Sequence, residues 1–193
     1  KPKKIRDFFI AGIEIIKILL AKLHLLKWSF NERVIERPFV FQNLPKSGRV
    51  LDIGCSDSIM PIEMASMGYE TYGNDLKNYP FRHPNLKFIR GDALKLNFQN
   101  DFFDAVTCIS TLEHVGLSKD YSGATEERKD RLLIEKIRKM LKNKGILILT
   151  IPFGTSRVLE NLHTRVYDSK EAGWLFSNFS IKHCFQKHSE NYY

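Results

Sequence analysis

The stretch of sequence that decides the fold is VLDIGCSDS, which occupies residues 50–58. Apolar residues suited to a buried strand lead into Gly54, where the backbone can approach a ligand that a Cβ atom would obstruct. The polar residues that follow deliver the chain into a helix that we expect from Ser58 onward. A dinucleotide loop would need the pattern GxGxxG, and only its first glycine is present. The stretch predicts either a ligand-facing turn without a pyrophosphate cradle or a purely structural strand-to-helix turn.

Short apolar strands and helices alternate from this stretch to the end of the chain. Beyond the strand at residues 50–53 and the helix at 58–67, the pattern predicts strands at 69–74, 86–90, 103–109, 146–151 and 180–185, and helices at 126–142 and 169–176. Strands joined by helical crossovers imply a mostly parallel sheet covered on both faces. We therefore predict an α/β, doubly wound, Rossmann-like domain.

A different pattern precedes this domain. From Asp7 to about Trp28 apolar residues recur at helical spacing, while charged residues interrupt every window of about 20 residues, the length that would span a bilayer. Pro38 and Pro45 then break the helical pattern. We divide the chain into a basic amphipathic helical arm at residues 1–47 and an α/β domain at residues 48–193.

The net charge of +8 is concentrated in the arm. Residues 1–48 hold ten Lys/Arg against four Asp/Glu, and the remaining residues hold twenty against eighteen. A nearly neutral domain does not favour nucleic acid as a partner. Three interpretations of the arm stay open: peripheral contact with an anionic membrane, docking on its own domain, and a homodimer contact.

The three cysteines are far apart and lack CxxC spacing, so the sequence predicts neither a disulfide framework nor a metal site. A reducing cytoplasm is the expected compartment, with the inner face of the membrane as the peripheral alternative.

Carboxylates follow the second and third predicted strands. Asp75 ends the second strand, where it is placed to accept hydrogen bonds from both hydroxyls of a ribose, and Asp92 follows the third, where it can accept from the exocyclic amine of adenine. Either one alone would be read as a turn former or helix cap. Together with Gly54, they predict a site for an adenosyl group at one edge of the sheet.

These motifs resemble those of the class I S-adenosylmethionine-dependent methyltransferases. The matching stretches are VLDIGC at residues 50–55, GNDL at 73–76, RGDA at 90–93 and LKNKG at 141–145. A narrower resemblance, to a branch that often acts on polysaccharides or small molecules, rests on STLEHVGL at residues 110–117 and TIPFG at 150–154. The resemblance implies S-adenosylmethionine as the cofactor, bound by Asp52, Gly54, Cys55, Ser56, Asp75, Leu76, Asp92, Ala93 and Ser110.

The chain departs from the family pattern in two respects. Ser56 and Ser58 stand where the family commonly has glycines, and no counterpart of the family's seventh strand is evident before Tyr193. The first departure predicts altered contacts with the methionine end of the cofactor. The second predicts an incomplete or modified C-terminal sheet edge.

We expect O-methylation of a small-molecule or glycan-type acceptor. His114, with Glu113 beside it, is the candidate general base; the alternative is that His114 orients a neighbour or forms part of the cofactor wall. Residues 116–124, which contain the candidate acceptor contact Tyr121, form either a lid over the acceptor site or a plain connector. His163, Arg165 and Tyr167 either line the acceptor pocket or are solvated loop residues. The rival interpretations are a membrane-associated lipid or quinone methyltransferase and a nucleoside-binding module without turnover.

Overall fold

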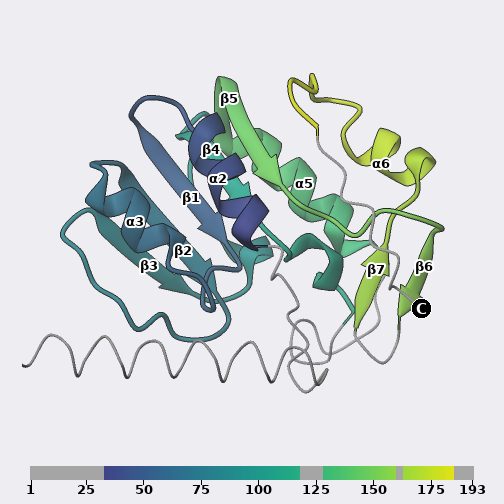
Figure 1. Ribbon diagram of the computed structural model, residues 1–193, viewed down its shortest axis with the longest axis horizontal. Coiled ribbons are helices and arrows are strands. Elements are labelled where there is room, and N and C mark those ends of the chain that lie inside the picture. The colour runs from purple at the N-terminus through teal and green to yellow at the C-terminus, as the bar shows by residue number, and fades with distance from the viewer. Residues whose placement is uncertain (1–32, 118–127, 160–162, 185–193) are drawn as a thin grey trace, which may run out of the picture. The chain divides into compact units, whose positions relative to one another are not determined.

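The structure, a computed structural model, describes residues 33–117, 128–159 and 163–184 (Figure 1). Its centre is a parallel sheet with the strand order β3-β2-β1-β4-β5. The strands are β1 (Arg49–Ile53), β2 (Glu70–Asp75), β3 (Leu86–Arg90), β4 (Phe103–Cys108) and β5 (Leu141–Leu149). The strand order reverses between β1 and β4, and ligands of open α/β sheets bind beyond the carboxyl ends of the strands at such a point. The predicted fold class is confirmed.

Helices cover both faces of this sheet (Figure 1). Among the described residues the α-helices are α2 (Arg33–Asn43), α3 (Met60–Ser66), α5 (Lys129–Met140) and α6 (Ser169–Leu175), and two short 3-10 turns are η1 (Ala93–Lys95) and η2 (Leu112–His114). A separate antiparallel pair is formed by β6 (Arg157–Leu159) and β7 (Thr164–Val166).

Alternation along the strands divides the core into two layers. Val50 of β1 and Ala105 of β4 pack with residues of α2 and α3 on one face. Leu51 of β1 and Val106 of β4 pack with residues of α5 and α6 on the other. Because successive strand residues point to opposite faces, a strand buried on both sides must be apolar at nearly every position. This requirement explains the mostly apolar sequences of β1 and β4.

Helix α2 corrects the prediction that Pro38 breaks the helical pattern. Pro38 lies inside α2, and Val40 of the same helix is fully buried against the sheet. Proline forgoes one backbone hydrogen bond in a helix. Burial of Val40 offsets that loss. A compact unit begins at Glu36, whereas the sequence assigned all residues up to 47 to the arm.

Two further boundaries differ from the predictions. Helix α5 ends at Met140 and β5 begins at once with Leu141, because Leu141 already has an extended backbone and pairs with Phe103. Residues 180–184 form no strand; Ile181 is 74% exposed, so this stretch has no apolar face to bury. Within the described ranges the parallel sheet ends at β5, and β6–β7 form their own sheet.

The predicted amphipathic helix at residues 7–28 lies outside the described residues, as does Phe185. In the part of the chain that the structure describes, no helix has the length and apolarity needed to cross a membrane.

Candidate functional site

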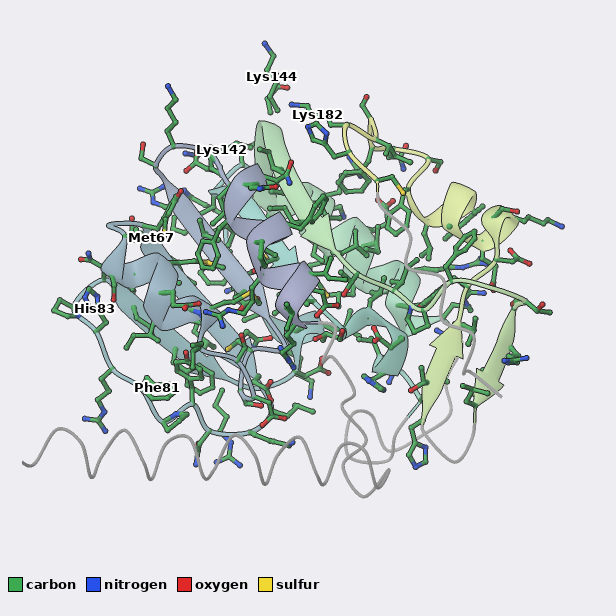
Figure 2. The ribbon with its side chains drawn as sticks, viewed as in Figure 1. Met67, Phe81, His83, Lys142, Lys144 and Lys182 are labelled. Carbon is green, nitrogen blue, oxygen red and sulfur yellow. The ribbon has the colours of Figure 1, made fainter. Side chains whose placement is uncertain are left out.

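A pocket lies beyond the carboxyl ends of β1, β2 and β3, bordered by η2 and the first residue of α5. The residues that line it are Ile53, Gly54, Asn74, Asp75, Leu76, Gly91, Asp92, Ala93, Leu94, Thr111, Val115, Gly116 and Lys129. The structure thus brings together Gly54, Asp75 and Asp92, which the sequence placed after three different strands. Figure 2 shows Lys142 and Lys144 near the start of β5, the strand at the other side of the sheet from β3.

Gly54 is held in a conformation that side chains rarely adopt. Its φ is +79°, and its amide donates to the carbonyl oxygen of Asn74 at 2.8 Å. A Cβ atom at this position would fall 2.1 Å from Oγ1 of Thr111. The Thr111 side chain that lies over Gly54 therefore requires a glycine here, which favours the structural one of the two interpretations that the sequence left open.

The Asp75 carboxylate is fixed by two backbone amides. Its Oδ2 atom accepts from the amide of Ser56 at 2.9 Å, and its Oδ1 atom accepts from the amide of Lys77 at 2.9 Å. The side chain is buried. Because a carboxylate oxygen has two lone pairs, each oxygen can accept one further hydrogen bond. This geometry suits two neighbouring hydroxyl groups.

Asp92 and Asn74 form the wall next to β3. The Oδ1 atom of Asp92 accepts from the amide of Leu94 at 2.9 Å and caps η1. The side-chain amide of Asn74 donates to the carbonyl oxygens of Ile89 and Gly91, at 2.9 and 3.0 Å, and so ties β2 to the end of β3. Sequence reasoning missed Asn74, although it stands next to Asp75 in the matched motif.

Four residues predicted to bind the cofactor do not line the pocket. Asp52 is buried, and its Oδ1 atom accepts from the hydroxyl of Thr107 at 2.6 Å. Burial, together with the charges of Asp52 and Asp75, raises the pKa of the Cys55 thiol, which stays protonated. Ser56 acts through its backbone amide on Asp75. Ser110 bonds elsewhere, to a carboxylate of α2.

Leu76 and Ala93, also predicted, do line the pocket. They supply apolar surface to the pocket that Asp75 and Asp92 also line. Three other lining residues were not predicted as part of the site: Thr111 and Val115, which come after β4, and Lys129, the first residue of α5. Thr111 lies inside the STLEHVGL stretch at residues 110–117, but a threonine there does not by itself distinguish a pocket wall from a turn.

His114 lies in η2, next to two lining residues. Its Nδ1 atom is 2.8 Å from the carbonyl oxygen of His163. A carbonyl oxygen can only accept, so Nδ1 is the nitrogen that donates in this contact. Glu113 is buried and outside the pocket lining. The pKa of the Cys108 thiol is raised, mainly by the burial of that thiol and next by the charge of Glu113.

Arg165 and Tyr167 correct the predicted acceptor contacts. Tyr167 is fully buried, and its hydroxyl donates to the Leu112 carbonyl oxygen or the Asp130 carboxylate, at 3.3 and 3.2 Å. Arg165 pairs with the same Asp130 at 2.8 Å and is also buried. A buried carboxylate needs cationic and hydrogen-bonding partners, and these two residues supply them. Tyr121 and residues 118–124 of the predicted lid lie outside the described residues.

Replacing Tyr167 with phenylalanine is expected to lower the free energy of unfolding by about 1 kcal/mol, because one buried hydrogen bond is lost. The KM for an acceptor should stay unchanged, since Tyr167 is in the core. Chemical denaturation and steady-state kinetics measure the two quantities. A raised acceptor KM at unchanged stability would restore the original prediction.

The described residues contain no group of three or more His, Cys, Asp or Glu side chains arranged to hold a metal ion.

Comparisons with known proteins identify a family and a shared fold. A family model described as a methyltransferase domain matches residues 28–188. A curated relative, the ubiquinone biosynthesis O-methyltransferase of Albidiferax ferrireducens, is 32% identical over 83 residues, which are 37% of this chain and 33% of that protein. This chain therefore matches about a third of the length of that relative.

Solved structures share the fold at low identity. A methyltransferase from Methanosarcina mazei, described as S-adenosylmethionine-dependent, has a TM-score of 0.55 at 19% identity, covering 73% of this chain and 82% of that one. The 1,6-didemethyltoxoflavin-N1-methyltransferase of Burkholderia thailandensis, solved with 1,6-didemethyltoxoflavin and S-adenosylhomocysteine bound, has a TM-score of 0.58 at 13% identity, covering 89% and 77%. Since the family model spans more than half of its residues, this chain belongs to the family of methyltransferase domains, as the predicted resemblance implied.

Proposed function

We propose that this chain transfers a methyl group from S-adenosylmethionine to a hydroxyl oxygen of a small-molecule or glycan-type acceptor. The observation that carries the proposal is the meeting of Gly54, Asp75 and Asp92 in one pocket. Membership of the methyltransferase domain family supports the same reaction.

The lining residues fit an adenosyl group. The two oxygens of Asp75, each already oriented by one backbone amide, are placed to accept from the two ribose hydroxyls. The Asp92 carboxylate offers an acceptor for the exocyclic amine of adenine. Leu76 and Ala93 supply apolar surface for the flat ring. With adenosine at these residues, the rest of the donor extends along the wall formed by Gly54 and Thr111.

Alignment is the main task of the chain in this reaction. S-adenosylmethionine supplies a methyl group activated by a sulfonium sulfur. The acceptor oxygen forms a bond to the methyl carbon while the carbon–sulfur bond breaks and sulfur keeps the electron pair. Holding the reacting atoms in line supplies most of the rate enhancement that such a displacement needs. Pocket walls fixed by backbone hydrogen bonds suit this task, because they do not have to reorganise.

His114 is the group that we propose as the general base. The hydrogen bond from Nδ1 to the His163 carbonyl oxygen orients the ring and leaves Nε2 to take the proton of the acceptor hydroxyl. Val115 and Gly116, the residues after His114, line the pocket. We assign no proton transfer to Glu113, because its side chain is buried.

Replacing His114 with alanine is expected to lower kcat about 100-fold or more, the usual contribution of a general base. The affinity for S-adenosylhomocysteine should change less than about twofold, since His114 is not among the lining residues. The matched control is His183→Ala, which removes an exposed histidine. A His114→Ala variant that keeps its kcat would assign His114 an orienting role only.

A second candidate is methylation of a lipid or quinone headgroup at a membrane. It is favoured by the similarity to a ubiquinone biosynthesis O-methyltransferase and by the basic residues at the start of the chain. Co-sedimentation with anionic liposomes tests it, comparing the full chain with a variant in which Lys1, Lys3, Lys4 and Arg6 are glutamine. The control variant neutralises four exposed lysines of the domain, Lys46, Lys144, Lys170 and Lys182. Loss of binding in the first variant alone would favour this candidate.

The proposal is tested by a turnover assay with labelled S-adenosylmethionine against a library of hydroxylated acceptors. We expect transfer of label to oxygen in at least one phenolic or glycan acceptor. Tight binding of S-adenosylhomocysteine without turnover on any acceptor would instead indicate a nucleoside-binding module. Absence of binding would overturn the proposal.

A further inference from the structure

A buried carboxylate of α2 reaches the carboxyl edge of the sheet. Glu36 is 5% exposed. Its Oε1 atom accepts from the hydroxyl of Ser110 at 3.1 Å and from the hydroxyl of Thr150 at 2.8 Å. The Thr150 hydroxyl also accepts from the backbone amide of Ser110 at 2.9 Å. A single carboxylate oxygen thus connects the segments that follow β4 and β5.

The segment after β4 needs such an anchor. Ser110 has a φ of +47°, in the left-handed region that is sterically unfavourable for a residue with a Cβ atom. Thr111 follows directly, and its hydroxyl donates to the carbonyl oxygen of Ile109 at 2.9 Å. The Thr111 side chain is the one that lies over Gly54 and lines the pocket. The conformation of Ser110 therefore decides where this wall of the pocket stands.

We propose that Glu36 is a positioning residue for the part of the donor that lies beyond the adenosine. By holding Ser110 and Thr150, it keeps Thr111 at the wall opposite the adenosine end marked by Asp75. Glu36 does not touch the donor and acts only through these hydroxyls. This inference rests on the proposed function, because it assumes that the pocket takes S-adenosylmethionine.

The network leaves the second oxygen of Glu36 unused. Among the described residues, Oε2 is buried and accepts no hydrogen bond. A glutamine can keep a carbonyl oxygen at the position of Oε1 and still accept both hydroxyl protons. Glu36→Gln and Glu36→Ala thus separate the loss of charge from the loss of the acceptor atom.

The experiment compares two ligands on each variant by calorimetric titration. Adenosine reaches only the Asp75 end, whereas S-adenosylhomocysteine also reaches the Thr111 wall. For Glu36→Ala we expect the Kd of S-adenosylhomocysteine to rise about tenfold, as the loss of hydrogen bonds to a charged group predicts, and the Kd of adenosine to change less than about twofold. Glu36→Gln should stay within about threefold of the parent for both ligands.

Two further variants keep the test decisive if Glu36→Ala folds poorly. Thr150→Val removes the shared hydroxyl without changing α2, and it should raise the Kd of S-adenosylhomocysteine but not that of adenosine. The double variant with Glu36→Ala should have a Kd close to that of Glu36→Ala alone, because both changes act on one network. The control Arg37→Gln removes a different polar contact of α2, the ion pair between Arg37 and Glu63, and should leave both Kd values unchanged.

Equal weakening of both ligands in Glu36→Ala, or the same effect in Arg37→Gln, would overturn the inference by making Glu36 a general structural residue. So would a Glu36→Gln variant as weak as Glu36→Ala. Failure of the parent chain to bind S-adenosylhomocysteine is a separate result, which refutes the proposed function itself.

Discussion

Replacing Asp75 with alanine is expected to weaken the binding of S-adenosylhomocysteine by about 100-fold or more. Two ribose hydroxyls lose a charged acceptor; each such bond contributes about 1.5–3 kcal/mol, and a factor of ten in Kd corresponds to about 1.4 kcal/mol. The amides of Ser56 and Lys77 lose their partner as well, so the turn after β1 also loses its anchor. Calorimetric titration measures the Kd, and thermal unfolding without ligand shows how much of the effect is structural.

The matched control for this prediction is Asp57→Ala. Asp57 belongs to the same turn and pairs with Lys77 at 3.4 Å, but its side chain is 74% exposed. An ion pair this exposed contributes little. We therefore expect the Asp57→Ala variant to bind S-adenosylhomocysteine like the parent chain. If Asp75→Ala behaved like Asp57→Ala, the ribose assignment would be refuted.

Replacing Gly54 with alanine is expected to destabilise the domain and abolish binding of S-adenosylhomocysteine together. The new Cβ atom would stand 2.1 Å from Oγ1 and 2.4 Å from Cγ2 of Thr111, so the segment after β4 must shift. The positive φ of +79° adds a penalty of about 1–2 kcal/mol for any residue with a Cβ atom. Chemical denaturation and calorimetric titration measure the two losses.

Gly68→Ala separates the two causes. Gly68 has a φ of +95°, but nothing lies within 4 Å of the position of its Cβ. This variant should lose only about 1 kcal/mol of unfolding free energy and no ligand affinity. Adding Thr111→Gly to Gly54→Ala removes the clash and should recover much of the lost stability. A Gly54→Ala variant no worse than Gly68→Ala would show that Thr111 does not hold the wall.

The sheet could be predicted from the sequence because its strands are buried on both faces. β1 and β4 are buried at nearly every position and are mostly apolar, so they stand out from the surrounding helices. β2 is buried as well, but its sequence ETYGND is mostly polar, so its place followed from the motif around Asp75 rather than from an apolar run. Helix α2 could not be predicted, because a local rule about Pro38 was outweighed by the burial of Val40 against a sheet that follows later in the chain. The strand expected at residues 180–185 is absent over residues 180–184. Local propensity favours a strand there, but among the described residues no neighbouring surface covers this exposed stretch.

The meeting of Gly54, Asp75 and Asp92 in one pocket could be predicted, because each of these residues ends or follows its own strand within a short motif. The other end of the pocket could not be predicted. The Thr111 wall depends on Glu36, which is distant in the sequence, and on a left-handed Ser110 that no composition rule identifies. Arg165 was predicted to contact an anionic acceptor because arginine commonly binds anions. Its ion pair with Asp130 could not be predicted, because it depends on the packing of β7 against α5.

The central claim is that Asp75 binds the ribose of an adenosyl group, and a crystal structure of the complex with S-adenosylhomocysteine tests it most directly. We expect both ribose hydroxyl oxygens within about 2.5–3.0 Å of the Asp75 carboxylate, the distance of a charge-assisted O–H···O bond. The adenine should lie against Ala93, and the chain beyond the sulfur along Thr111. A ligand bound elsewhere, or ribose hydroxyls that make no contact with Asp75, would contradict the account.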